Sequence, residues 1–167
     1  ISGNREIYNP PAVVLRKGTA AIISYLRRLL DGMVTNDFDL SDLGLTDVPH
    51  DITREYTALT KLNLANNKIT TLPKNIDNLD EMTQLILDGN PISVLQPSMG
   101  NLTLLEVLAI DEFANIVVPP PEINAKGLAL TLKYLRRVLT AEQTNRLDLS
   151  QMGLRELPKH VLEMHSL

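Results

Sequence analysis

One stretch of the sequence occurs twice, and this repetition constrains the fold more than any other feature. KGTAAIISYLRR begins at Lys17 and KGLALTLKYLRR begins at Lys126, an offset of 109 residues. The same offset relates the DLS at Asp39 to the DLS at Asp148, without insertion or deletion. A fixed internal period is typical of a chain built from stacked repeats. We therefore expect one repetitive structure instead of several unrelated domains.

A shorter period lies between the two copies. LTKLNLANNKITTLP from Leu59 and MTQLILDGNPISVLQ from Met82 align with a step of 23 residues. Both match L-x-x-L-x-L-x-x-N-x-I/L, the spacing of a leucine-rich repeat. Leu62 and Leu64 fall on one face of a short strand, and the side-chain amide of Asn67 can bond the backbone of neighbouring turns. The spacing predicts one strand and one turn from each repeat.

Extending this frame gives five strand units. They are Phe38–Leu40, Leu62–Leu64, Leu85–Leu87, Leu108–Ile110 and Leu147–Leu149, with steps of 24, 23, 23 and 39 residues. The long step leaves room for a true helix over residues 126–139, and its twin spans 17–30. We predict an α/β fold, a curved solenoid in one domain over residues 1–167, with parallel strands on the concave face and helices on the convex face. Neither end has the polar cap that solenoids need, so we expect a segment of a longer solenoid.

The two long helices share an apolar stripe. Its paired positions are Thr19/Leu128, Ile23/Leu132, Leu26/Leu135 and Leu30/Leu139, at i, i+4, i+7 and i+11. This spacing predicts that the stripe packs on the solenoid. At about 100° per residue, five basic residues point away from it and form a second candidate surface on the convex side. They are Lys17, Arg28, Lys126, Lys133 and Arg137. Such a face suits an acidic partner or phosphate groups, and a merely solvated helix face is the alternative interpretation.

Three stretches carry a resemblance to a known family. LILDGNPI, NPP and KGTAAIISYLRRLL resemble intracellular leucine-rich repeat proteins of the Ras-suppressor and scribble type, including their long-helix units of the form K-G-x-x-x-I-x-x-Y-L-R. The resemblance covers essentially the whole chain. It implies a curved α/β solenoid without a cofactor, and a role as a protein-binding scaffold.

Composition narrows the class of partner. Hydrophobic residues make up 44% of the chain and charged residues 22%, with a net charge of −4, so nothing attracts nucleic acid or anionic membrane in general. No apolar run approaches the roughly 20 residues of a bilayer span, so we expect no membrane insertion. The absence of cysteine favours a cytoplasmic, reducing compartment.

Motifs for catalysis are missing from the sequence. There is no G-x-S-x-G nucleophile elbow, no G-K-[ST] to cradle a phosphate, and no cysteine to complete a metal site. We expect no enzyme activity, cofactor, metal or small-molecule substrate, and one or more protein partners, within a larger complex. The alternative is a regulatory recognition domain of a larger enzyme, a GTPase, kinase or ubiquitin ligase, whose catalytic module lies outside this chain.

The outward positions of the strands identify a candidate protein-binding site. Repeat solenoids usually bind through their aligned strand faces. In the third and fourth units these positions place Ile86, Val107 and Ala109 together as an apolar patch. Three acidic residues flank the patch on one side: Asp88, Asp111 and Glu112. An exposed apolar patch with a polar rim is typical of a contact site. The alternative is that neighbouring chain covers the patch.

Overall fold

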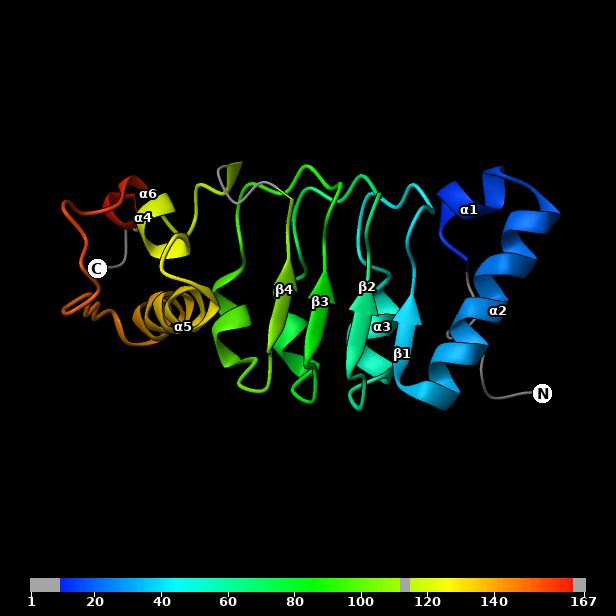
Figure 1. The fold of residues 1–167 in the computed structure, drawn as a ribbon, viewed down its shortest axis with the longest axis horizontal. Helices are drawn as coiled ribbons and strands as arrows, with labels where there is room; N and C mark the ends of the chain where they lie inside the picture. Colours follow the sequence, from blue (N-terminus) through cyan, green and yellow to red (C-terminus); the bar gives the residue numbers. More distant parts are fainter. Residues whose placement is uncertain (1–9, 112–114, 164–167) are drawn as a thin grey trace.

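The structure is a computed structural model that describes residues 10–111 and 115–163 of the 167-residue chain. Within these residues, parallel strands form a four-stranded sheet in chain order. The strands are β1 (Asp37–Asp39), β2 (Lys61–Asn63), β3 (Gln84–Ile86) and β4 (Val107–Ala109). Their central residues, Phe38, Leu62, Leu85 and Leu108, lie opposite one another. The predicted α/β fold and the frame of its first four units are therefore confirmed, and the elements stand in one elongated row (Figure 1).

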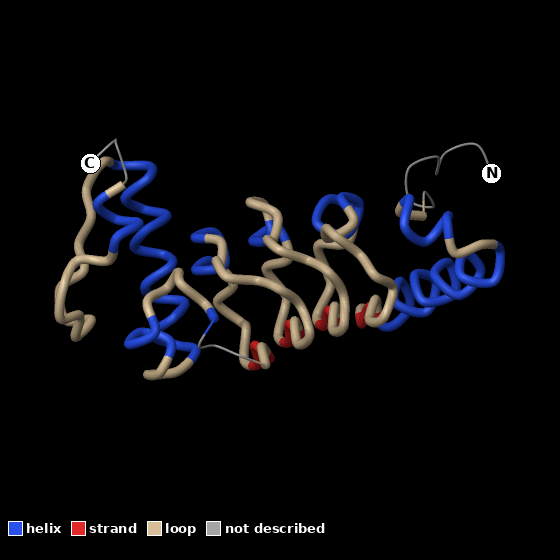
Figure 2. Tube along the Cα trace, turned by 90° about the horizontal axis from the view of Figure 1, so that it is seen from above, coloured by secondary structure: helices blue, strands red, loops and turns tan. Residues whose placement is uncertain are grey.

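The chain returns from each of the first three strands through a short helical segment. These segments are α3 (His50–Glu55), η1 (Ile76–Asn78) and η2 (Pro97–Asn101). They lie on the side opposite the strands (Figure 2). One hydrophobic cluster, here called the main core, fills the space between the two sides and includes Ile52, Ile76 and Met99 from the returning segments. Burial of this continuous cluster holds the stacked repeats together, because each repeat alone has too little to bury.

Asparagine side chains tie neighbouring repeats to each other. Asn67 donates to the carbonyl oxygens of Leu40 at 2.9 Å and Leu64 at 2.7 Å. Asn90 donates to those of Leu64 and Leu87, each at 2.9 Å. A buried carbonyl without a partner is costly, so these amides stabilise the turn between strand and return segment.

Two helices of 17 residues each, α2 (Thr19–Thr35) and α5 (Leu128–Thr144), correspond to the predicted twins at 17–30 and 126–139. Each begins two residues later than predicted, because Gly18 and Gly127 precede them with φ angles of 87° and 96°, a region that favours glycine. Each also runs five residues further. The asparagines at positions 36 and 145 end them in the left-handed conformation, which asparagine tolerates.

The long helices stand at the two sides of the sheet (Figure 1). The short α1 (Ala12–Arg16) precedes α2, and α4 (Pro121–Asn124) precedes α5. The chain after α5 continues to α6 (Lys159–Leu162) on the side of α5 away from the sheet (Figure 1). A second hydrophobic cluster, with Tyr134, Val138 and Met152 at its centre, fills the space between α5 and this last segment.

The prediction of a single apolar stripe is incomplete, because each helix has a second apolar face that the prediction missed. The front face is the predicted stripe, represented by Leu132 and Leu135 in α5, which pack with the main core. The rear face carries Tyr134 and Val138 in α5, at the positions of Tyr25 and Leu29 in α2. In α2 the rear face is buried, while Ile23 and Leu30 of the front face are exposed. A pattern of spacing alone does not say which of two faces has a neighbour.

The predicted fifth strand is also wrong. Residues 147–149 do not form a strand in the described part of the chain. By the 109-residue offset they correspond to β1, which pairs only with the strand that follows it. The helix α5 separates residues 147–149 from β4, so no strand edge lies beside them (Figure 1). A sheet therefore ends where a long helix is inserted.

Candidate protein-binding surface

Apolar side chains meet on the outer face of β3 and β4. Val107 pairs with Gln84, and Ala109 pairs with Ile86, in adjacent parallel strands. Val107 is 43% exposed, and Ile86 and Ala109 are half-buried. The described chain thus leaves this patch open to solvent instead of covering it. We call Ile86, Val107 and Ala109 the apolar patch.

Two carboxylates lie at the end of the same strands. Asp111 accepts a 2.7 Å hydrogen bond from the backbone N–H of Gly89. Burial, followed by the neighbouring charge of Asp111, raises the pKa of Asp88 above its ordinary value. The two side chains therefore concentrate negative charge beside the apolar patch. Glu112, the third predicted acidic residue, lies outside the described residues.

The other half of the strand face is polar. Asp39 on β1 accepts hydrogen bonds from the hydroxyl of Ser41 at 2.6 Å and the side-chain amide of Asn63 at 3.2 Å. Burial alone would raise the pKa of Asp39, but the hydroxyl and N–H of Ser41, together with Arg28, hold it below its ordinary value. These polar groups are hydrogen-bonded to one another on the outer side of β1 and β2. The apolar part of the strand face is therefore concentrated on β3 and β4.

Comparison with known proteins agrees with this geometry. The family model described as Leucine rich repeat matches residues 36–92, which include β1, β2 and β3. Residues 36–92 are thus similar to leucine-rich repeats. The chain is 37% identical over 81 residues to Plant intracellular Ras-group-related LRR protein 4 of Oryza sativa subsp. japonica, across 47% of this chain and 14% of that relative. The relative is thus much longer than the matched region, and its name agrees with the Ras-type resemblance of the repeats.

The basic residues predicted to form a free convex surface mostly donate hydrogen bonds to the protein's own backbone. Lys17 donates to the carbonyl oxygen of Leu43 at 2.7 Å, and Arg28 donates to that of Ser41 at 2.7 Å. In the second copy, Lys126 donates to Met152 at 3.0 Å and Arg137 to Ser150 at 2.7 Å. These four side chains bend back to backbone carbonyls instead of extending freely into solvent, although Lys17 and Lys126 remain exposed.

Lys133 differs from the other four predicted basic residues. It is exposed on α5 and lines a groove of about 510 Å³ between α5 and η2. Gly100 and Leu102 of η2 and its C-cap form one wall, and Leu132 and Arg136 of α5 form the other. Sequence reasoning missed this junction. The available signal was the glycine at position 100, where the preceding repeat has Asp77.

None of the helices within residues 10–111 and 115–163 combines the length and apolar character needed to cross a bilayer. The same residues contain no cluster of three or more histidine, cysteine or acidic side chains that could hold a metal ion.

Proposed function

We propose that the protein is a non-catalytic interaction module that binds a partner protein through its strand face. The observation that carries this proposal is the apolar patch on paired strands, in which Val107 is exposed and Ile86 and Ala109 are half-buried, although the rest of the strand face is polar. Leucine-rich repeats are typically protein-interaction modules, and the repeat family is shown for residues 36–92.

The chemistry of the patch suggests the kind of partner. Ile86 and Val107 offer an apolar anchor, and Asp88 and Asp111 supply negative charge at its edge. Apolar anchors hold affinity, whereas charge at a rim mainly sets specificity and the association rate. We therefore propose that the partner presents an apolar side chain within a basic or mixed-charge segment.

The cellular setting follows from two observations. The rice relative is named intracellular, and this sequence contains no cysteine. We propose that the protein works in the cytoplasm within a larger assembly. A partner recovered from a cytoplasmic extract, and absent from secreted material, supports this setting.

Matched surface variants test the proposed function. Ile86→Asp and Val107→Asp place a charge in the apolar patch, and each should lower partner binding at least about tenfold, as loss of an apolar anchor does. Lys133→Glu is the control on α5, because Lys133 is exposed and makes no hydrogen bond or ion pair with any described residue. It should leave binding unchanged. Arg137→Glu is a poor control, since Arg137 holds the backbone at Ser150.

Binding is measured on partners that are identified by mass spectrometry from a cytoplasmic extract and then purified. Unchanged thermal unfolding of each variant shows that the fold is intact. Raising the salt concentration should slow association more than it speeds dissociation. If Ile86→Asp and Val107→Asp keep every partner while Lys133→Glu loses them, the helical side is the binding surface and the proposal fails.

A further inference from the structure

The sheet ends at β4, and the outer edge of this strand pairs with none of the described residues. On β3, the backbone N–H of Leu87 donates to the carbonyl oxygen of Ala109 in the next strand at 2.8 Å. Ile110 stands one repeat later, and its N–H bonds no described residue. Because backbone groups alternate in direction along a parallel strand, those of Leu108 also face this edge. The edge of β4 therefore presents a row of donors and acceptors on which another strand can pair.

The side chains at this edge are less covered than those of the other strands. Leu108 and Ile110 pack against the main core but are only half-buried. Their equivalents in the first three repeats are at most 1% exposed: Phe38, Leu40, Leu62, Leu64, Leu85 and Leu87. Each of those repeats has a further strand on this side, whereas β4 has none among the described residues. A strand added to β4 would thus cover apolar surface as well as pair the backbone.

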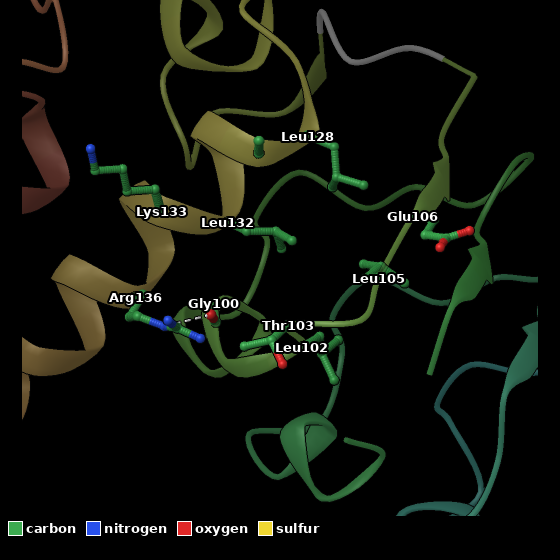
Figure 3. A pocket seen from close by; sticks show the side chains of 10 residues that line it. Gly100, Leu102, Thr103, Leu105, Glu106, Leu128, Leu132, Lys133 and Arg136 are labelled. Atoms are coloured by element: carbon green, nitrogen blue, oxygen red, sulfur yellow. Dashed lines mark hydrogen bonds between the residues drawn. The ribbon is translucent and has the colours of Figure 1, made fainter. Parts of the chain in front are cut away.

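A groove of about 510 Å³ lies beside the start of β4. Leu105 and Glu106, which directly precede β4, line one side of the groove, and Leu132 points into it from α5 on the other side (Figure 3). The two sides are fixed where η2 meets α5, because a Cβ atom at Gly100 would overlap the backbone of Arg136. The Nε of Arg136 also donates to the carbonyl oxygen of Gly100 at 2.9 Å. The groove is therefore already formed in the chain without a ligand.

The wall formed by α5 is positively charged. Lys133 lines the groove, is exposed, and makes no hydrogen bond or ion pair with any described residue. Residues 128–137 of α5 contain no acidic side chain. A carboxylate in a ligand complements this wall.

We propose that the open edge of β4 and the adjoining groove bind an extended segment of a partner protein, which adds to the sheet as a further strand. Backbone hydrogen bonds to Leu108 and Ile110 hold the segment, and apolar side chains at every second position enter the groove. An acidic side chain of the segment reaches Lys133. The site is the edge of the sheet, whereas the apolar patch is on its outer face, so the inference does not depend on the proposed function.

Short fluorescent peptides serve as probes. Each alternates threonine with one type of apolar residue (valine, isoleucine, leucine or phenylalanine) and carries one glutamate. At least one of them should bind the whole chain saturably in a fluorescence anisotropy titration. Backbone N-methylation of every second residue removes the donors from one edge of an extended peptide. Methylation of the set that faces β4 should weaken binding at least about tenfold, and methylation of the other set should not.

A matched pair of variants locates the site on the protein. Ala129 is exposed on α5 and lines the groove, so Ala129→Trp should fill the groove and weaken binding at least about tenfold. Ala20 occupies the same position on α2 and is also exposed, so Ala20→Trp should leave binding unchanged. Unchanged thermal unfolding shows that both variants are folded.

Amide hydrogen exchange reports on the edge itself. When the peptide saturates the protein, the amides of Leu108 and Ile110 should exchange at least about tenfold more slowly, because they gain hydrogen-bond acceptors. The amide of Leu87 should change less, because it already donates to Ala109.

Three outcomes overturn the proposal. The first is that none of the peptides binds. The second is that the two N-methylated sets bind equally, which means that the peptide backbone is not recognised. The third is binding that survives Ala129→Trp or leaves the exchange of Leu108 and Ile110 unchanged, which means that the peptide binds elsewhere. The partners from cell extract are not used here, so failure of this proposal is distinguishable from failure of the proposed function.

Discussion

The N-terminal unit of α1, α2 and β1 and the C-terminal unit from α4 to α6 have matching sequences in different surroundings. The N-terminal unit is complete on its rear side, where β1 pairs with β2 and Phe38 and Leu40 are fully buried. In the C-terminal unit the corresponding Leu147 and Leu149 are only partly buried. The front sides show the reverse, because α5 is covered by η2 and α2 is not.

This comparison teaches that the two copies show two different contacts, here called the two halves of the junction. The front face of α5 receives the repeat turn η2, and the chain leaving α2 enters the sheet at β1. Within the described residues, each copy shows one half of that junction. The basic residues at positions 17, 28, 126 and 137 fasten the rear half in both copies through the same pairs of backbone carbonyls.

The largest expected difference between the two units is in the free energy of unfolding that is lost when a leucine is truncated. The two residues to compare are Leu40, which follows β1, and its counterpart Leu149. Leu40→Ala should lower the free energy of unfolding by about 2–5 kcal/mol, as large-to-small changes in a packed core do. Leu149→Ala should lower it by less than about 1.5 kcal/mol, because Leu149 is still partly exposed. Urea unfolding measures both. Equal losses would show that residues 147–149 are packed as tightly as β1.

The next largest difference concerns the sizes of two residues that face each other, one on the long helix and one in the segment that follows it. Gly32 lies against the ring of Phe38, and an added Cβ atom would overlap that ring. The C-terminal unit has Ala141 opposite Leu147 at these positions, a larger helix residue with a smaller strand residue. Gly32→Ala should therefore destabilise by about 1–3 kcal/mol, as overpacking does.

The double variant Gly32→Ala with Phe38→Leu provides the control. Its loss of unfolding free energy should be smaller than the sum of the losses of the two single variants, because leucine at position 38 makes room for the new methyl group at position 32. Thermal and urea unfolding of the four proteins completes the cycle. Strict additivity would mean that the two positions do not compensate each other.

The hydrogen bonds that Arg28 and Arg137 donate to backbone carbonyls should contribute similarly to the free energy of unfolding in the two units. Arg28→Met and Arg137→Met retain much of the side-chain volume but leave the carbonyl oxygens of Ser41 and Ser150 without these donors. Each change should destabilise by about 1 kcal/mol, a typical net value for one hydrogen bond. Chemical unfolding of the single and double variants tests this. An effect in only one unit would break the equivalence.

The smallest expected effect is a dependence of stability on pH, and it is confined to the C-terminal unit. The ring of His160 lies 2.9 Å from the hydroxyl of Tyr134, whereas position 51 of the N-terminal unit is aspartate. Burial lowers the pKa of His160 below 6.5, and the charge of Glu163 opposes this only in part. The folded state therefore favours the neutral ring.

Because the unfolded chain takes up the proton first, this contribution is complete above pH 6.5 and is lost as the pH falls toward the lower pKa of the folded state. An NMR titration of the His160 ring should give a midpoint below 6.5. A midpoint above that value would contradict the buried, neutral state. Tyr134→Phe tests whether the hydrogen bond contributes.

Features that repeat along the sequence could be predicted from it. The 23-residue step placed Leu62 and Leu85 in register, and alternation along the strands placed Ile86 and Val107 on the outer face. These inferences succeed because a strand puts every second side chain on one side, whatever its neighbours are.

Features that depend on neighbours could not be predicted in the same way. Residues 147–149 have a strand-like pattern, but a strand also needs a paired neighbour, and none of the described residues pairs with them. The direction of Arg28 follows from the carbonyl oxygen of Ser41, just after β1, and not from its angle on the helix. The contact at Gly100 depends on how closely two segments approach in space.

Amide hydrogen exchange of both units in one sample tests the junction most directly. The account predicts a crossed pattern, since exchange follows local stability. The amides of β1 should exchange more slowly than those of residues 147–149, and the amides of α5 should exchange more slowly than those of α2. If one unit is instead more protected in both its helix and its strand segment, the two copies are not opposite halves of one junction.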